Sequence, residues 1–239
     1  MVTEQIPLRF GWRDGRSFGN YFAGDDLESC SQSNAEAVHH VQRAAAGEPG
    51  AEQFLFLWGA ASVGKSHLLQ AACQHAAENQ RTVAYLPMVE LIDLSAEIFE
   101  GLEQMSLICL DDVQLIAGKA EWEEALFHFY NRMRDAGGSL LVMASAAPSA
   151  LAVALPDLQS RLSWGPVLQL NELDDAGKIS ALQLRAKGRG FELPDEVAQF
   201  LMRRSARDMA SLFLLLDRLD EASLVQQRRL TIPFVRGLI

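Results

Sequence analysis

The stretch that decides the fold is Gly59-Ala60-Ala61-Ser62-Val63-Gly64-Lys65-Ser66, which matches the pattern G-x-x-x-x-G-K-[ST] at every fixed position. An apolar run, Phe54–Trp58, precedes it and has the length and aromatic content of a buried strand. Apolar residues at helical spacing follow it, starting at Leu68 and Leu69. A glycine-containing loop between a strand and a helix start binds phosphate, because its N–H groups and the helix N-terminus point at the anion. We therefore predict a phosphate-binding loop, the alternative being a Gly-rich turn that only connects two core elements.

The chemistry of this loop follows from its last residues. Lys65 brings a full positive charge to the outer phosphates of a nucleotide, and the hydroxyl of Ser66 can hold Mg²⁺. The candidate nucleotide contacts of this segment are Gly59, Ala60, Ala61, Ser62, Val63, Gly64, Lys65, Ser66 and His67.

A second apolar run ends in two carboxylates, in the segment Ser106-Leu107-Ile108-Cys109-Leu110-Asp111-Asp112. This pattern predicts a buried parallel strand with acids at its carboxyl end, where open α/β sheets bind ligands. We expect Asp111 to bind Mg²⁺, directly or through water, and Asp112 to orient or deprotonate an attacking water. Taken alone, two such residues are more often a helix cap or a turn.

Length and composition are those of a soluble, cytoplasmic nucleotide-binding protein. The chain has 239 residues, 49% of them hydrophobic, which is enough for one large domain and a small one. Its three cysteines are scattered without metal-ligand spacing, and we read them as reduced thiols. We see no signal peptide or membrane-spanning stretch. The net charge of −10 argues against broad contact with nucleic acid, so we expect protein partners and little direct DNA binding.

The order of elements predicts an α/β fold with a helical lid. Strands are expected near 54–58, 82–86, 107–111, 139–145 and 167–170, separated by helical segments, which implies a parallel sheet covered on both faces. From residue 174 the pattern is helical only, with Asp175 as the expected first cap. We predict a leader at 1–16, a nucleotide-binding domain at 17–170 and a lid at 171–239.

Several segments together resemble the AAA+ module of the bacterial replication initiator DnaA. They are the phosphate loop, residues 107–119, the helical stretch 122–131, residues 155–165 and residues 190–194. An upstream box at 17–24 corresponds to the one that packs around the base in that family, which implies base contacts from Phe18, Tyr21 and Phe22. The DNA-reading helix-turn-helix domain of the initiator has no counterpart here. The chain therefore resembles the Hda family, the shortened relatives of the initiator.

The resemblance implies a regulator of DnaA that binds ADP or ATP with Mg²⁺ and prevents re-initiation of replication. Arg161 falls at the position of the arginine finger, offered to the γ-phosphate of a neighbour, and Arg207 at that of the lid arginine, which reaches the chain's own nucleotide. Without the resemblance, each of the two could equally be an ordinary solvent-exposed arginine with no functional role. Where the initiator has an acidic sensor this chain has Ala146, with Ser145 the nearest polar side chain, so we expect at most a weak ATPase. The family relation allows self-association through AAA+ interfaces.

The N-terminal segment Gln5-Ile6-Pro7-Leu8-Arg9-Phe10 resembles the hexapeptide that docks proteins on the DNA polymerase sliding clamp. Gln5, Ile6, Leu8 and Phe10 would then enter a preformed apolar pocket of the clamp. Six-residue patterns also arise by chance, and a leader or an edge strand is the alternative.

Three functions remain open from the sequence. The first is the clamp-docked regulator that stimulates hydrolysis of DnaA-bound ATP. The second is a helicase-loader-like or initiation-coupling ATPase of the same fold. The third is a small-molecule phosphotransferase, for which we find no acceptor site.

Overall fold

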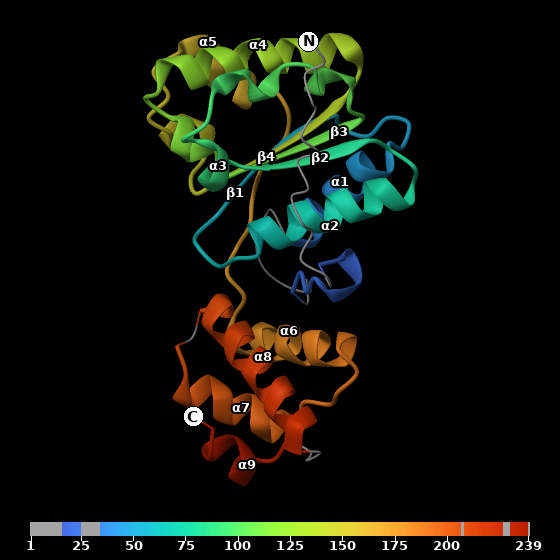
Figure 1. The fold of residues 1–239 in the computed structure, drawn as a ribbon, viewed down its shortest axis with the longest axis vertical. Coiled ribbons are helices and arrows are strands. Elements are labelled where there is room, and N and C mark those ends of the chain that lie inside the picture. Colours follow the sequence, from blue (N-terminus) through green and yellow to red (C-terminus); the bar gives the residue numbers. More distant parts are fainter. Residues whose placement is uncertain (1–15, 25–33, 207, 227–229, 239) are drawn as a thin grey trace, which may run out of the picture.

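Five apolar segments form one parallel sheet in the order β2-β3-β4-β1-β5 (Figure 1). The strands are β1 Phe54–Trp58, β2 Val83–Pro87, β3 Leu107–Asp111, β4 Ser139–Ala144 and β5 Val167–Gln169. This architecture comes from a computed structural model, which describes residues 16–24, 34–206, 208–226 and 230–238. Because all strands run the same way, the loops that follow β1, β3 and β4 emerge at one edge of the sheet.

Each face of the sheet carries its own apolar cluster, because successive side chains of a strand point to opposite sides. On one face, Leu55 and Leu57 of β1 pack with α1 (Asn34–Ala46) and α2 (Lys65–Glu78). On the other face, Phe56 packs with α3 (Met88–Leu91) and with α4 and α5. The longer helices of this face are α4 (Ala120–Ala136) and α5 (Pro156–Leu162). The short 3-10 helices are η1 Phe18–Asn20, η2 Ala96–Phe99, η3 Leu102–Gln104, η4 Val113–Ile116 and η5 Pro148–Ala150.

A buried glutamate fixes the chain that leads into α5. The side chain of Glu123, 1% exposed, accepts hydrogen bonds from the backbone N–H groups of Gly118 at 2.6 Å, Ala154 at 2.9 Å and Leu155 at 2.7 Å. One carboxylate thus satisfies three donors from two loops that are distant in sequence. It positions the start of α5, the helix that carries Arg161.

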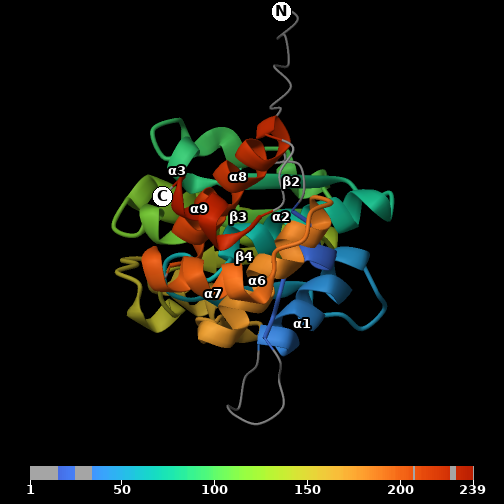
Figure 2. The ribbon, with the colours of Figure 1, turned by 90° about the horizontal axis from the view of Figure 1, so that it is seen from below.

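The C-terminal helices form a lid with a separate apolar core. They are α6 Asp175–Gly188, α7 Asp195–Arg204, α8 Met209–Gln226 and α9 Ile232–Arg236, and they lie in front of the sheet when the molecule is seen from below (Figure 2). The chain leaves the sheet at Asn171, whose N–H and C=O both bond to the side chain of Asn34 at the start of α1. This pair of hydrogen bonds, 2.8 and 3.0 Å long, fixes the point where the lid begins.

The predicted order of elements is confirmed, with shifts of a residue at some ends. All five strands are present, and β4 ends at Ala144, one residue before the expected end. The cap of α6 is Asp174 and not Asp175, because its side chain accepts from the N–H of Gly177 at 2.7 Å. Within the described residues, the helices are too short or too polar to cross a membrane.

Candidate functional site

The phosphate loop runs from the end of β1 to the start of α2 with two residues in the left-handed region. Ser62 has φ of 65° and Gly64 has φ of 96°, and this geometry aims the loop backbone toward one point. A Cβ atom at Gly59 would lie 2.5 Å from the carbonyl oxygen of Leu170, so only glycine fits where the loop passes the end of the sheet. The sequence pattern at these glycines therefore has a direct steric cause.

Lys65 lies under the loop and is 8% exposed. Its Nζ donates to the carbonyl oxygens of Gly59 at 2.9 Å and Ala60 at 2.7 Å. Burial lowers the pKa of Lys65, while the charges of Asp112 and Asp111 oppose that change. The ammonium is held at the mouth of the loop, where an anion would meet a partly desolvated cation.

The two carboxylates after β3 have different surroundings. Asp111 is 1% exposed, and its oxygens accept from the Tyr85 hydroxyl at 2.8 Å and from the N–H of Asp112 at 3.0 Å. Burial raises the pKa of Asp111, and hydrogen bonds from Ser66 and Tyr85 oppose that shift. Asp112 has φ of 58°, which turns the chain so that it lines the open cavity beside Lys65. Asp111 is therefore a buried carboxylate next to Ser66, whereas Asp112 faces the open cavity.

Gln114 connects the carboxyl ends of two strands. Its Nε2 donates to Asp112 Oδ1 at 2.9 Å, and its Oε1 accepts from the N–H of Ser145 at 3.0 Å. Ser145, exposed at the end of β4, is the polar residue that the sequence placed at the sensor position. Sequence reasoning missed Gln114, although its place two residues after Asp112 is a usable signal.

A cavity of about 560 Å³ lies between the loop and the lid. Its walls come from the phosphate loop, the ends of β3 and β4, and helices α6 and α8. They include Ala61, Ser62, Gly64, Lys65, Ser66, His67, Asp112, Gln114, Ser145, Arg185, Met209, Phe213 and Asp217. Among the described residues, no group of three or more His, Cys, Asp or Glu side chains could hold a metal by itself.

A second cavity of about 310 Å³ adjoins the first and is lined by the upstream box and the lid. Tyr21, Phe22 and Val63 are among its lining residues, and it shares His67, Met209 and Phe213 with the first cavity. Phe18 is not one of the described residues that line it. The ring of Phe18 instead meets the ring of His75 edge-on at 5.5 Å and packs toward the sheet. The structure thus places Tyr21 and Phe22 at the cavity and Phe18 against His75, and base contact by any of the three stays a prediction.

His67 fastens the upstream box to the phosphate loop. Its Nε2 lies 2.9 Å from Asn20 Oδ1 and 3.3 Å from the carbonyl oxygen of Ser17, and its ring meets Tyr21 edge-on at 5.3 Å. Burial lowers the pKa of His67 to about 4, so the imidazole is neutral at physiological pH. A neutral ring here avoids adding a buried charge between the box and the loop.

Arg161 lies on α5, which packs on the same face of the sheet as α4, at the end of the molecule away from the lid (Figure 1). Its guanidinium sits over the ring of Trp164 at 5.0 Å, and it helps to line a small crevice with Tyr130. In the described part of the chain it makes no ion pair and lines neither of the two cavities above. Arg134 shares the Trp164 ring at 5.4 Å but is paired with Asp135. Arg161 therefore presents a cation that has no carboxylate partner among the residues that the structure describes.

Five predicted site residues lie outside the described residues. They are Gln5, Ile6, Leu8 and Phe10 of the N-terminal segment, and Arg207 of the lid.

With this geometry in place, comparison with known proteins settles the family. Residues 25–169 match the bacterial DnaA ATPase domain, and residues 175–239 match the lid domain of Hda. The chain belongs to the DnaA-related Hda family. A Haemophilus influenzae protein described as uncharacterized is 42% identical to this Hda-family chain over all of it and 99% of that protein.

Solved structures show the same fold. Domain III of the Thermotoga maritima initiator DnaA matches this Hda-family protein with a TM-score of 0.76 and 23% identity, covering 94% of the chain and 95% of that domain. AMPPCP-bound DnaA from Aquifex aeolicus matches with a TM-score of 0.66 and 24% identity, covering 81% of the chain and 63% of that protein. The predicted α/β AAA+ core with a C-terminal helical lid is confirmed.

Proposed function

We propose that this protein binds an adenine nucleotide between core and lid, docks on the sliding clamp and stimulates hydrolysis of ATP bound to DnaA. The nucleotide part is supported by the two adjoining cavities, one lined by aromatic rings and one by the phosphate loop. The AMPPCP-bound DnaA from Aquifex aeolicus, which shares the fold, holds an ATP analogue. ADP or ATP would then place its base near Tyr21 and Phe22 and its phosphates at Lys65.

The donor set at the loop fits a magnesium ion that accompanies the phosphates. Ser66 offers a hydroxyl, and Asp111 lies behind it with both oxygens already hydrogen-bonded, which favours contact through water. The ion would neutralise phosphate charge, and Asp112 would orient a water near the terminal phosphate. Asp112 is also bonded to Gln114, which fixes its direction.

The observation that carries the regulatory role is the position of Arg161. Arg161 lines neither described cavity, which supports a role toward a phosphate held by a neighbour and not toward the nucleotide of its own chain. It has no described carboxylate partner to give up, so contact with a phosphate would not break an ion pair. Arginine fingers of this kind contribute roughly 10³–10⁵ in rate, or about 4–7 kcal/mol of barrier.

The decisive experiment measures conversion of labelled ATP to ADP on DnaA, with clamp loaded on DNA. Arg161→Ala should keep its fold, its nucleotide and its clamp affinity but lose the stimulation. Arg161→Lys should lose nearly as much, because an ammonium cannot span two phosphate oxygens. Arg134→Ala is the matched control, since it removes the other arginine on the same indole ring. Full stimulation by Arg161→Ala would rule out the finger, and turnover by this protein alone would favour the helicase-loader-like alternative.

A further inference from the structure

Arg185, an arginine of the lid, faces the phosphate cavity. Arg185 lies on α6 and lines the cavity together with Lys65, Ser66 and Asp112. Its guanidinium stacks on the ring of Phe213 at 4.4 Å, which restrains its direction. The Nε atom of Arg185 is buried and has no hydrogen-bond partner among the residues that the structure describes. A buried guanidinium donor without an acceptor is costly, and it points to an acceptor that the protein alone does not supply.

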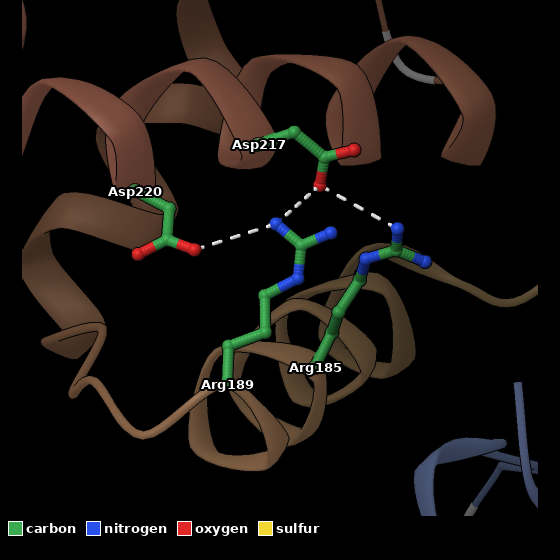
Figure 3. Close-up of polar contacts among 4 residues, drawn as sticks. All are labelled: Arg185, Arg189, Asp217 and Asp220. Atoms are coloured by element: carbon green, nitrogen blue, oxygen red, sulfur yellow. Dashed lines mark hydrogen bonds and ion pairs between the residues drawn. The ribbon is translucent and has the colours of Figure 1, made fainter. Parts of the chain in front are cut away.

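Among the residues that the structure describes, Arg185 forms one ion pair, with Asp217 on α8, and its N–O distance of 3.5 Å is long. Figure 3 shows Arg185 of α6 and Arg189, the residue after the end of α6, converging on one carboxylate oxygen of Asp217, Arg185 at 3.5 Å and Arg189 at 2.8 Å. Arg189 also reaches Asp220 at 3.5 Å. The shorter bond belongs to Arg189, so Asp217 keeps a charged partner if Arg185 turns away.

We propose that Arg185 binds the phosphate tail of a nucleoside diphosphate or triphosphate, and that Asp217 is the counter-ion from which the phosphate takes it. This inference rests on the nucleotide site proposed above, and it concerns a residue other than Arg207, the family's lid arginine. A phosphate offers several charged oxygens in the geometry that a guanidinium fork matches. Asp217 lines the same cavity, so acid and phosphate compete for one cation.

The electrostatics of the site agree with this exchange. The charge of Arg185 is one of the causes that lower the pKa of His67 at the start of α2, which places the lid cation within electrostatic reach of the phosphate loop. If Arg185 moves away from Asp217, the carboxylate of Asp217 still has a charged partner, because Arg189 remains bonded to it. Ligand binding would therefore bring α6 and the phosphate loop onto the same anion.

Competition between Asp217 and the phosphate for Arg185 predicts that one variant, Asp217→Asn, binds Mg·ADP more tightly than the wild type does. Arg185→Gln should weaken binding of Mg·ADP by about tenfold or more, since it removes a charged hydrogen bond. Asp217→Asn should tighten Mg·ADP binding, because the competing acid is gone. Neither change should alter the affinity for AMP, which lacks the outer phosphates. A purely structural role of the cluster would instead make both variants bind ADP more weakly.

The test is isothermal titration of the full chain, freed of retained nucleotide, with Mg·ADP and with AMP. Lys187→Gln is the matched control, because it removes an exposed cation from the same helix. Unchanged ADP affinity in Arg185→Gln, while Lys65→Ala loses it, would overturn this inference and leave the nucleotide site standing. Unchanged affinity in Lys65→Ala would refute the site itself. If Arg185→Gln does not fold, Arg185→Lys and Asp217→Asn take its place in the test. Weaker ADP binding by Asp217→Asn would then reject the proposed exchange of Arg185 between Asp217 and the phosphate.

Discussion

Replacing Glu123 by alanine tests how strongly one buried carboxylate stabilises the fold. The change removes the acceptor of the N–H groups of Gly118, Ala154 and Leu155. A hydrogen bond to a charged group contributes roughly 1.5–3 kcal/mol, so three independent ones would contribute about 6 kcal/mol. The three bonds share one carboxylate, and water can reach the exposed Gly118 and Ala154 after the change, so we take about half of that sum as the net cost. The expected loss in the free energy of unfolding is therefore about 3 kcal/mol.

Urea denaturation, followed by circular dichroism and tryptophan fluorescence, measures this loss. Glu124→Ala is the matched control, since Glu124 is the next residue of α4 and its side chain is 72% exposed. The control should change stability by less than about 0.5 kcal/mol. A loss below about 1 kcal/mol in Glu123→Ala would refute the reasoning from these three hydrogen bonds.

The same variant also has an expected effect on activity. Ala154 and Leu155 lead directly into α5, so their release should loosen the helix that holds Arg161. Stimulation of hydrolysis on DnaA should then fall at temperatures where Glu123→Ala is still folded. Full stimulation at those temperatures would separate Glu123 from the placement of Arg161.

Three further predictions concern the ligand, the partner and pH. Lys65→Ala should lose the rise in melting temperature that ADP gives the wild type, a stabilisation of roughly 2.7 kcal/mol at a hundredfold excess over the dissociation constant; an undiminished rise would remove Lys65 from the site. Deleting residues 1–10 should abolish clamp binding in surface plasmon resonance and leave ADP binding intact, whereas unchanged clamp affinity would make the hexapeptide match accidental. The folded state keeps His67 neutral down to a pKa of about 4, whereas an unfolded histidine titrates near 6.5. Acid therefore favours the unfolded state, and stability should fall between about pH 6.5 and 4 by up to about 3 kcal/mol. His67→Gln should show a smaller fall across that range, and an equal fall would assign it to other groups.

Much of the fold could be predicted because it rests on local signals. The strand before the phosphate loop and the strand ending at Asp111 are apolar runs bounded by turn residues, and such runs reveal buried strands without knowledge of the tertiary structure. Helix ends were less certain. Asp174 and Asp175 are equally good cap residues by type, and only the contact with Gly177 distinguishes them.

The candidate site was predictable where one segment supplies the chemistry and not where distant segments meet. The phosphate loop is contiguous, so its residues could be named from the sequence. Gln114 joins the ends of two strands. Arg185 and Asp217, which lie 32 residues apart in the sequence, join two lid helices. Such contacts depend on how elements pack. Phe18 belongs to the same upstream box, and its edge-on contact with His75 is another contact that the sequence does not reveal.

The lid and the sheet have separate apolar cores, and this separation has a consequence for how the protein melts. Cooperative unfolding requires that the loss of one part expose enough surface to destabilise the other. Here the two cavities have walls from both parts, including Lys65 from the core and Met209 from the lid. A ligand that touches both walls adds its binding free energy only when both are folded. The nucleotide concentration would then decide whether calorimetry records two transitions or one.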